Sequence, residues 1–585
     1  GFDDAAWRPV SPGTGITARP TAQIDAPIRV ERELTPAKIT QPRPGVHVFD
    51  LGQNMVGAVR LKVSGEAGQK VRIRHAEVLN KDGTIYTANL RTAKATDTYV
   101  LRGGGTEVYE PEFTFHGFRY VEVTGLPGAP SKGTVTGRVM HTAAPFTMDF
   151  KTNDGMLNQL HSNITWGQRG NFLSIPTDTP ARDERLGWTG DINVFSRTAT
   201  YNMESARFLS KWMQDMRDTQ GSNGAFPDVA PRIGGLGEGA AGWGDAGVTV
   251  PWNLYRAYGD RRVLEQNYPA MRKWISYLEN NSNGLLRPAA GYGDWLNIND
   301  ETPKDVIGTA YFAYVADLVA DIARVLGKED EAAQYDDLAG RVREAFTKAY
   351  VTDGRIKGDT QTAYVLALSM NLLPEAARKP AADRLVQLIE ARDWHLSTGF
   401  LGTPQLLPVL TATGHTDVAY RLLHQRTFPS WGYQIDRGAT TMWERWDSIR
   451  PDGSFQDAGM NSFNHYAYGA VGEWMYENIA GISAGEPGYR RTVIRPRPGG
   501  DVDRASGRYD SVYGPIETSW SGKGGRFDLT VSVPVNTTAE VWVPARSAAE
   551  VSQSGARFLR MQDGAAVFTV GSGTYHFSAR PSGTG

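Results

Sequence analysis

The period of the hydrophobic pattern changes twice along this chain, and that change limits the possible fold more than any other feature. Apolar and polar residues alternate from about 27 to 145, for example over 59–63, as they do in antiparallel strands with one buried face. From about 150 the period becomes helical, with an apolar stripe over 311–326 opposite charged residues. Alternation returns after about 490, for example over 527–533. The pattern therefore predicts strands, then helices, then strands.

The helical region contains further amphipathic stretches separated by loops rich in glycine or proline, at 204–220, 262–279, 331–349, 362–372, 375–391, 415–425 and 463–479. At ordinary helix and loop lengths, roughly ten to twelve helices fit in this region. Antiparallel helix pairs in that number favour a closed toroid, because an open row leaves two apolar faces uncovered. We therefore predict an (α/α)6 barrel, although the pattern alone does not fix its closure.

Length and pattern together predict a multidomain chain. Its 585 residues correspond to about three domains at the usual roughly 100 to 200 residues each. We predict a central (α/α)6 barrel at 146–490, flanked by an N-terminal β-sandwich at 27–145 and a C-terminal β-sandwich at 491–585. Residues 1–26 are polar and contain prolines instead of alternating, so we predict that they form a connector.

Composition excludes several classes of function. The 62 Lys and Arg residues balance 64 Asp and Glu residues, so no global field favours nucleic acid or an anionic membrane surface. The absence of cysteine excludes disulfide scaffolds, thiolate metal sites and cysteine nucleophiles. No apolar run approaches the roughly 20 residues needed to cross a bilayer. A neutral ligand fits better, and the 15 Trp and 24 Tyr residues are suited to the apolar faces of sugar rings.

The segment 175–191 concentrates unusual chemistry. It contains the acids Asp178, Asp183, Glu184 and Asp191, two arginines and a tryptophan, in a stretch interrupted by prolines and glycines. We predict a loop, because these breakers disfavour a regular helix or strand. Crowded carboxylates raise one another's proton affinity, which suits a proton donor. The alternative is a salt-bridged structural turn, and the local pattern does not separate the two.

A second candidate segment covers 438–447, followed by 461–466. Glu444 lies between Trp443 and Trp446, and such a ring-lined place suits both sugar binding and the tuning of a carboxylate. One acid here and one near 184 would form the usual glycosidase pair. The alternative is a structural segment in which Glu444 pairs with an arginine. For His465 taken alone, a buried structural histidine fits the pattern better.

Other motifs argue against other chemistries. The glycine-rich run 234–244 follows no visible strand and lacks Gly-Lys-Ser/Thr, so we reject a nucleotide-binding loop. We predict a flexible wall that presents Trp243, with a plain loop as the alternative. The 10 histidines lack ligand spacing such as His-Glu-x-x-His. We therefore predict no catalytic metal and no cofactor. No Gly-x-Ser-x-Gly elbow follows a strand, so a serine hydrolase is disfavoured.

The run RDERLGWTGD at 182–191 resembles the signature of the bacterial α-L-rhamnosidases of glycoside hydrolase family 78. The resemblance covers nearly the whole chain and extends to DLGQNMVG at 50–57, HAEVL at 75–79, FPDVAP at 226–231, WERW at 443–446 and NHY at 464–466. It implies the order β-sandwich, (α/α)6 barrel, β-sandwich, and it supplies the closure of the barrel. Members commonly carry further N-terminal β-domains, so residues 1–26 are expected to connect to a missing one.

Taken position by position, the resemblance implies an inverting glycoside hydrolase that releases terminal α-L-rhamnose. Glu184 would be the general acid that protonates the glycosidic oxygen, and Glu444 would be the general base that activates water. The implied substrate-binding residues are Asp178, Arg182, Trp188, Asp191, Trp243, Trp295 and His465. The partner would be a rhamnose-containing glycoside or polysaccharide, with no nucleic acid and no membrane.

Two alternatives belong to other classes. One is a polysaccharide lyase or another glycosidase on the same toroid, and a lyase would release an unsaturated product that absorbs ultraviolet light. The other is a non-catalytic carbohydrate-binding protein, which would bind sugar without turnover. The sequence leaves open the aglycone, the oligomeric state and the compartment, since both a secreted and a cytoplasmic location fit.

Overall fold

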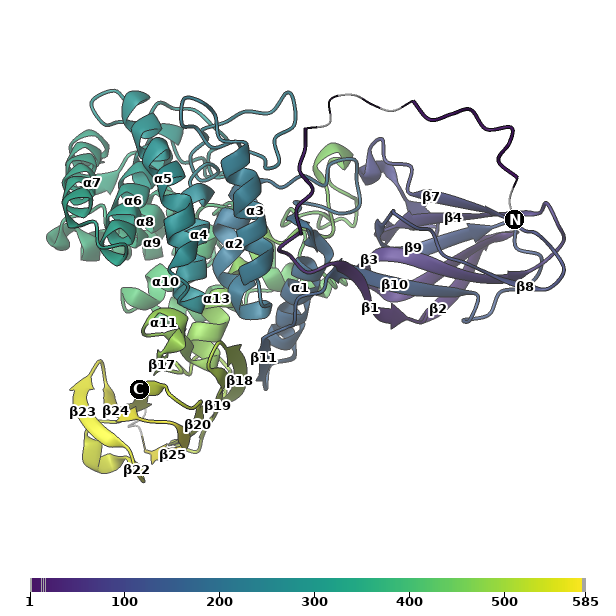
Figure 1. The fold of residues 1–585 in the computed structure, drawn as a ribbon. Coiled ribbons are helices and arrows are strands. Elements are labelled where there is room, and N and C mark those ends of the chain that lie inside the picture. Colours follow the sequence, from purple (N-terminus) through teal and green to yellow (C-terminus); the bar gives the residue numbers. More distant parts are fainter. Residues whose placement is uncertain (1–2, 12, 14, 16, 581–585) are drawn as a thin grey trace.

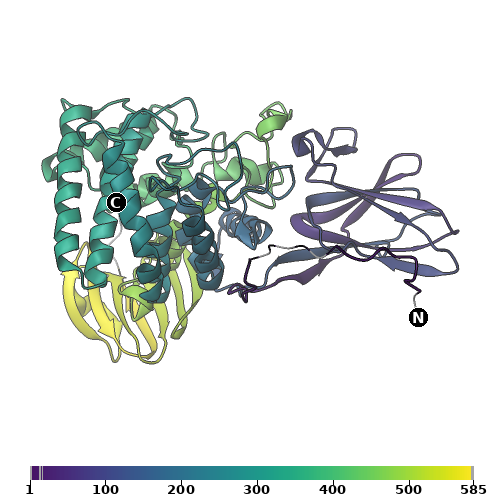
Figure 2. The ribbon, with the colours of Figure 1, turned by 45° about the horizontal axis from the view of Figure 1, so that its top comes forward.

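The computed structural model describes residues 3–11, 13, 15 and 17–580. An N-terminal sheet domain is followed by a helical domain and then by C-terminal sheets (Figure 1). This order confirms the fold class predicted from the hydrophobic period. Figure 2 shows the C-terminal strands beneath one end of the helices and the N-terminal sheet domain beside them.

The N-terminal sheet domain is built around one apolar core. Its strands are Ile28–Leu34 (β1), Lys38–Arg43 (β2), Val46–Ser64 (β3), Lys70–Ala76 (β4), Val78–Leu79 (β5), Ile85–Tyr86 (β6), Thr96–Val100 (β7), Thr106–Tyr109 (β8), His116–Thr124 (β9) and Val135–Thr142 (β10). Eight of them form one sheet along the path β1-β10-β3-β9-β4-β7, with β2 and β8 paired to β3. Alternate residues such as Val71 and Ile73 are buried, as the period of two predicts.

The long strand β3 bulges where it meets the helical domain. Its register with β9 shifts between Asp50 and Met55, and a bulge of this kind turns side chains away from the ladder. Within the bulge, the Gln53 amide donates to the Thr440 carbonyl at 2.7 Å, and the Asn54 N–H donates to the Thr440 hydroxyl at 2.9 Å. The bulge therefore holds one end of the segment that carries Glu444.

The described part of the helical domain contains thirteen α-helices: Gly155–Asn171 (α1), Thr189–Asn202 (α2), Ala206–Asp218 (α3), Ala246–Tyr258 (α4), Arg262–Asn280 (α5), Lys304–Val325 (α6), Glu329–Tyr350 (α7), Gln361–Ser369 (α8), Glu375–Glu390 (α9), Thr403–Ala412 (α10), Thr416–Leu423 (α11), Trp431–Asp436 (α12) and Val471–Trp474 (α13). Two short hairpins accompany them: Phe172–Leu173 (β12) with Ile175–Pro176 (β13), and Val351–Thr352 (β14) with Arg355–Ile356 (β15).

Six of these helices contact one another in a ring. α2 contacts α4, α4 contacts α6, α6 contacts α8, α8 contacts α10, α10 contacts α13 and α13 returns to α2. The intervening helices α5, α7, α9 and α11 each contact a member of this ring. Closing the row in this way covers the apolar faces that an open row would expose to water.

Two helical details differ from the sequence pattern. By length and composition α6 is apolar enough to cross a membrane, although no such run was expected, but 83% of its most apolar window is buried inside the protein. It is therefore a core helix, apolar all round because neighbours cover it on all sides. The amphipathic stretch 463–479 is helical only from Ala467 onwards and is irregular, because 461–466 runs past Glu444 first.

The C-terminal region forms two sheets, of order β11-β18-β19-β20-β25-β22 and β16-β17-β21-β24-β23. Their strands are Met148–Thr152 (β11), Ile482–Ala484 (β16), Arg491–Ile494 (β17), Arg504–Ser511 (β18), Gly514–Lys523 (β19), Arg526–Val533 (β20), Thr538–Pro544 (β21), Ser552–Gln553 (β22), Arg557–Gln562 (β23), Ala565–Val570 (β24) and Gly573–Ala579 (β25). Strand β11 precedes the helices in sequence, yet it pairs with β18. The described residues before 27 form no helix or strand.

Candidate active site

A cavity of about 210 Å³ opens where several ring helices begin. Its lining residues are Asp178, Arg182, Glu184, Trp188, Asp191, Trp243, Tyr292, Trp295, Phe400, Glu444, Met460 and His465. The segments that supply them run into the N-terminal ends of α2, α4, α6, α10 and α13. Helix N-termini carry unpaired N–H groups and partial positive charge, which favours acids and hydroxyl ligands at this end.

All nine residues singled out from the sequence lie in this one cavity. The sequence reasoning missed Tyr292, Phe400 and Met460. Tyr292 stands in a Gly-Tyr-Gly run, and Phe400 stands among small residues close to a glycine. Such glycines next to an aromatic residue are the one signal that pointed to Trp243, and they would also have pointed to these two.

The segment 175–191 is a loop only over 177–188, because Ile175–Pro176 form strand β13 and α2 begins at Thr189 and contains Asp191 in its first turn. The loop closes on itself: the Asp178 N–H donates to the Leu186 carbonyl at 3.0 Å, and the Leu186 N–H donates to Asp178 Oδ1 at 2.9 Å. Gly190 is required by packing, since a Cβ there would lie 2.4 Å from the Trp243 ring. The loop prediction was therefore wrong for Asp191, which the helix holds in place.

Arg182 joins the two proposed catalytic acids. Its Nε and Nη2 both lie 2.9 Å from Glu184 Oε2. Its Nη1 donates to Glu444 Oε2 at 2.8 Å, and its Nη2 donates to Glu444 Oε1 at 3.1 Å. The N–H groups of a guanidinium donate in its plane. Carboxylates on two adjacent edges of that plane have carboxyl carbons roughly 7 Å apart at hydrogen-bond distances of this kind. Arg182 and Glu444, which are 262 positions apart in the sequence, thus share one cavity.

Glu444 lies at the bottom of the cavity, on a segment fixed by a neighbouring stretch of chain. The Glu444 N–H donates to the Ser462 carbonyl at 3.0 Å, and the Ser462 N–H donates to Glu444 Oε2 at 2.9 Å. Burial raises the pKa of Glu444, but the charge of Arg182, with smaller effects of His465 and of the hydrogen bonds, outweighs burial and leaves the pKa below its ordinary value. Glu444 is therefore a carboxylate at neutral pH.

Glu184 lies nearer the mouth of the cavity, and the N-terminal sheet domain reaches it. Its Oε1 accepts from Trp188 Nε1 at 2.9 Å. Its Oε2 accepts from Arg91 Nη2 at 2.9 Å, and Arg91 Nε also donates to Asp183 at 2.6 Å. Arg91 follows a short helical turn, Ala88–Leu90, and no local pattern identified it. An arginine from a different domain therefore completes the surroundings of this acid.

Two further acids lie beside the pair. His465 Nε2 lies 2.9 Å from Asp191 Oδ1, and His465 Nδ1 accepts from the Ala467 N–H at 3.4 Å, so a neutral His465 ring carries its proton on Nε2. Burial, together with the charges of Glu184 and Asp191, raises the pKa of Asp178 well above its ordinary value. Crowding of carboxylates was expected to favour a proton-holding group in this segment, and its effect falls on Asp178.

Aromatic rings form one wall of the cavity. Tyr292 packs edge-on against Trp188 and Trp295, with ring centroids 5.6 and 6.2 Å away, and tilted against Trp243 at 4.7 Å. Asp294 fixes this wall from behind, since it accepts hydrogen bonds from the Thr362 hydroxyl and from three backbone N–H groups of the segment 399–402. The rings offer an apolar surface next to the carboxylates, which suits a sugar.

The charges of the cavity are paired mainly by two arginines, Arg182 with Glu184 and Glu444 and Arg91 with Glu184. Within the described residues, the one group of His and acid side chains with metal-ligand spacing is His75, Asp97 and His116 in the N-terminal sheet domain. The cavity is therefore suited to acid–base chemistry carried by its own carboxylates.

Family models match three consecutive parts of the chain. The bacterial alpha-L-rhamnosidase concanavalin-like domain matches residues 40–141, the 6 hairpin glycosidase domain matches 145–479, and the C-terminal domain matches 481–558. The central match alone covers more than half of the chain. These matches follow the same order as the N-terminal sheet, the helices and the C-terminal sheets.

Individual relatives agree with the family models. An alpha-L-rhamnosidase of Streptomyces avermitilis is 68% identical over 580 residues, which cover 99% of this chain and 56% of that protein. An alpha-L-rhamnosidase of Alteromonas sp. is 38% identical over 564 residues, which cover 93% of this chain and 61% of that protein. The chain thus spans little more than half the length of these curated relatives.

Solved structures show the same fold. The crystal structure of the Streptomyces avermitilis alpha-L-rhamnosidase complexed with L-rhamnose matches with a TM-score of 0.97, covering 99% of this chain and 56% of that one. The native enzyme from Aspergillus terreus matches with a TM-score of 0.90 at 39% identity, covering 96% of this chain and 65% of that one. The resemblance that began with the run at 182–191 is confirmed: this chain belongs to the bacterial α-L-rhamnosidase family.

Proposed function

We propose that this chain is an α-L-rhamnosidase that hydrolyses terminal α-L-rhamnosides with inversion. One observation carries the proposal: Glu184 and Glu444 bind two adjacent edges of the Arg182 guanidinium within one aromatic-lined cavity. A separation of roughly 7 Å between their carboxyl carbons falls in the roughly 6.5–9.5 Å range of inverting glycosidases and above the roughly 5–5.5 Å of retaining ones. That spacing leaves room for a water molecule beside the sugar.

In this mechanism Glu184 gives its proton to the glycosidic oxygen, and Glu444 takes a proton from water on the opposite face of the ring. Glu444 suits the role of base because it is ionised and fixed. A carboxylate accepts about four hydrogen bonds, and Glu444 accepts three from Arg182 and Ser462. One acceptor position is therefore left for the attacking water.

The sugar would be held by the remaining residues of the cavity. We propose that Asp178, Arg182 and Asp191 bind hydroxyl groups, that His465 lies near the base, and that Trp188, Trp243 and Trp295 form the walls. L-rhamnose has a methyl group where glucose has a hydroxymethyl group, so an apolar wall favours it, while an extra hydroxyl would lack a partner. The volume of about 210 Å³ is below the roughly 300–1,000 Å³ of drug-sized sites, which suits one terminal sugar ring.

Arg91 would act as a positioning residue for the acid. It contacts Glu184 and Asp183 at once, so it fixes the loop 178–188 against the N-terminal sheet domain. The limits of that domain, 27–145, of the barrel, 146–490, and of the second β-sandwich, 491–585, are likewise a proposal. The family matches at 40–141, 145–479 and 481–558 support the order and the approximate limits, although strand β11 of the barrel range pairs in the C-terminal sheet.

The test is proton NMR of the first product formed from an aryl α-L-rhamnoside. The expected product is β-L-rhamnose, and initial release of the α-anomer would rule out inversion. A panel of aryl glycosides tests the sugar: α-L-rhamnoside should be hydrolysed far faster than α-L-arabinoside, β-D-glucuronide or β-D-glucoside. Equal rates across the panel would contradict the assignment to rhamnose.

A further inference from the structure

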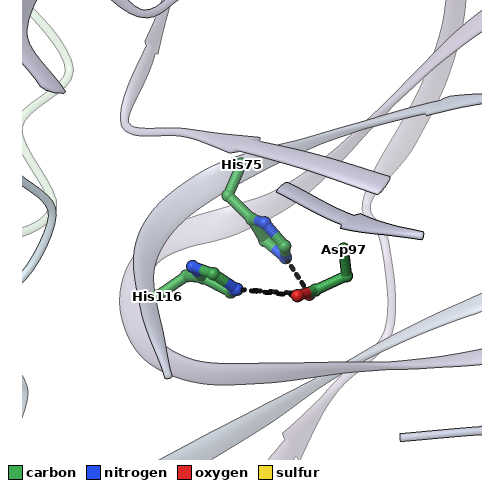
Figure 3. Close-up of side chains that lie close together, drawn as sticks. All are labelled: His75, Asp97 and His116. Atoms are coloured by element: carbon green, nitrogen blue, oxygen red, sulfur yellow. Dashed lines mark hydrogen bonds and ion pairs between the residues drawn. The ribbon is translucent and has the colours of Figure 1, made fainter. Parts of the chain in front are cut away.

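Three side chains of the N-terminal sheet domain converge at a point that the proposed reaction does not use. His75 is the penultimate residue of β4, Asp97 lies in β7 and His116 begins β9, and Figure 3 shows them pointing toward one another. His116 Nε2 lies 3.2 Å from Asp97 Oδ2, and His75 Nε2 lies 3.9 Å from the same oxygen. One potential ligand atom from each residue lies within 4.8 Å of the other two.

The tautomer of His75 is fixed by its backbone partner. The Ala95 carbonyl accepts from the backbone N–H of His75 at 3.1 Å, and the same oxygen lies 3.0 Å from the ring nitrogen His75 Nδ1. A carbonyl only accepts, so Nδ1 carries the proton and Nε2 presents a lone pair. Metal-binding histidines commonly have this arrangement, in which the second ring nitrogen donates to a carbonyl or carboxylate.

The lone pair of His75 has no partner among the described residues. The side chain is fully buried, and its Nε2 makes no hydrogen bond. It faces a carboxylate oxygen of Asp97, which is also an acceptor. Two acceptors facing each other in a buried place cost free energy unless something positive lies between them.

A positive charge on His75 itself is unfavourable here, because the side chain is fully buried. The two rings are nearly parallel, with centroids 4.0 Å apart, so two imidazolium ions side by side would repel each other. A divalent cation that displaces the proton between His116 Nε2 and Asp97 would bind both rings and the carboxylate, and it would satisfy the lone pair of His75.

We propose that His75, Asp97 and His116 form a structural binding site for a divalent transition-metal ion. Two imidazoles and one carboxylate suit zinc, whereas calcium and magnesium prefer sites built entirely from oxygen. Tetrahedral zinc holds neighbouring ligand atoms about 3.4 Å apart, given bonds of about 2.0–2.2 Å. The His116–Asp97 pair already has this spacing, and His75 Nε2 needs to approach Asp97 by only about half an ångström.

The position of the site suggests what the ion stabilises. Ala95, which binds His75, belongs to the segment that presents Arg91 to Glu184. The residue before His116, Phe115, accepts from Arg185 Nη2 at 2.9 Å through its carbonyl. The ion would therefore fix the two N-terminal strands on which the loop 178–188 rests, without contact to substrate.

The experiment measures zinc binding by the full chain after dialysis against a chelator, using isothermal titration calorimetry and metal analysis. We expect one zinc ion per chain. The main variant is Asp97→Asn, which keeps an oxygen that accepts from His116 but removes the charge. It should lower zinc affinity at least about tenfold. His141→Gln is the matched control, because His141 is also buried in this sheet domain and should bind zinc like the parent chain.

A second experiment uses only the parent chain, so it does not depend on whether a variant folds. Cobalt added to the parent chain should give the visible absorption of a tetrahedral nitrogen and oxygen site, and zinc should abolish it and raise the Tm. Absence of stoichiometric zinc, or equal zinc affinity in Asp97→Asn and the parent chain, would overturn the proposal in favour of a bridging water. None of these readouts depends on glycosidase activity.

Discussion

The two segments that carry the cavity's carboxylates are fixed in opposite ways. The side chain of Glu184 is 16% exposed and lies between the guanidinium groups of Arg91 and Arg182. The side chain of Glu444 is 3% exposed, and its segment is fixed mainly by backbone pairing with Ser462. Two ion pairs hold Glu184, whereas one buried ion pair with Arg182 and hydrogen bonds with Ser462 hold Glu444. The proposed acid therefore lies in the more exposed position and the proposed base in the buried one.

The N-terminal sheet domain supports both segments, but with different groups. It reaches the first through the charged Arg91, which contacts Asp183 and Glu184. It reaches the second through amides, since Asn54 donates to the Thr441 hydroxyl and to the Phe463 carbonyl at 3.3 and 3.2 Å. Charged contacts near the surface are screened by salt, whereas buried amide networks are not. The following predictions test this contrast, in order of expected effect on activity.

The largest effect is expected for Glu444→Gln. Loss of the proposed base should lower kcat by about 10³-fold or more with every leaving group, because water activation is needed whatever the aglycone is. The measurement is kcat for activated aryl and for alkyl rhamnosides. A loss that appears only with alkyl rhamnosides would contradict the role of base.

Glu184→Gln should be the next most damaging substitution, with an effect that depends on the leaving group. Loss of protonation should lower kcat/KM by about 10²- to 10⁴-fold for alkyl rhamnosides. Activated aryl rhamnosides need little protonation, so they should lose far less. The measurement is the slope of log kcat/KM against the pKa of the leaving group. An equal loss across the series would show that Glu184 is not the acid.

A smaller effect is expected for Arg91→Gln, which leaves Glu184 with Arg182 and Trp188. Buried charged hydrogen bonds contribute roughly 1.5–3 kcal/mol, and because Arg91 is partly exposed we expect kcat/KM to fall only about 10- to 30-fold. The fall should be larger for alkyl than for activated aryl rhamnosides, and Arg91→Lys should restore part of it. An equal fall for both substrate classes would contradict a role through the acid.

The control for Arg91 is Arg60→Gln, which removes an arginine of the same domain that pairs with Glu33 and Glu110 far from the cavity. This variant should hydrolyse both substrate classes like the parent chain. If it loses as much activity as Arg91→Gln, general weakening of the domain explains both results.

Arg91 also shows how far the sequence could predict this molecule. Hydrophobic period gave the order of strands and helices, because burial on one face leaves a direct pattern in the sequence. It did not reveal short or largely buried helices such as α4 and α10. The cavity residues were found where glycines, prolines, acids and aromatics cluster, as at 175–191. Arg91 lies in an ordinary stretch, and only packing between domains brings it to Glu184.

Pairing across the sequence was equally hidden. Glu184 and Glu444 each looked like a candidate for a structural salt bridge with an arginine, and both indeed bind Arg182. The structural and functional interpretations therefore do not exclude each other here, since one guanidinium both neutralises and orients the two acids. A local pattern cannot show this, because the arrangement depends on ring helices that bring distant loops to one end of the domain.

The smallest effect on activity is expected for Glu77→Gln. Glu77 and Asn54 together form the buried hydrogen-bond network by which the N-terminal sheet domain contacts the Glu444 segment. Glu77 accepts from Asn54, Asn89 and the Phe463 N–H at 3.1, 2.9 and 3.3 Å, and burial raises its pKa to about 7 from an ordinary 4.5. The folded chain thus holds a proton that the unfolded chain releases above pH 4.5. This contribution to stability is complete below pH 4.5 and is lost as the pH rises through 7.

Glutamine mimics the protonated acid at every pH. Urea unfolding at pH 5 and pH 8 should therefore show Glu77→Gln gaining up to about 3 kcal/mol on the parent chain over this interval, with kcat at pH 5 changed less than about threefold. A stability difference that stays constant between the two pH values would mean that Glu77 is ionised in the folded chain, and that the base segment, like the acid segment, is held by charge.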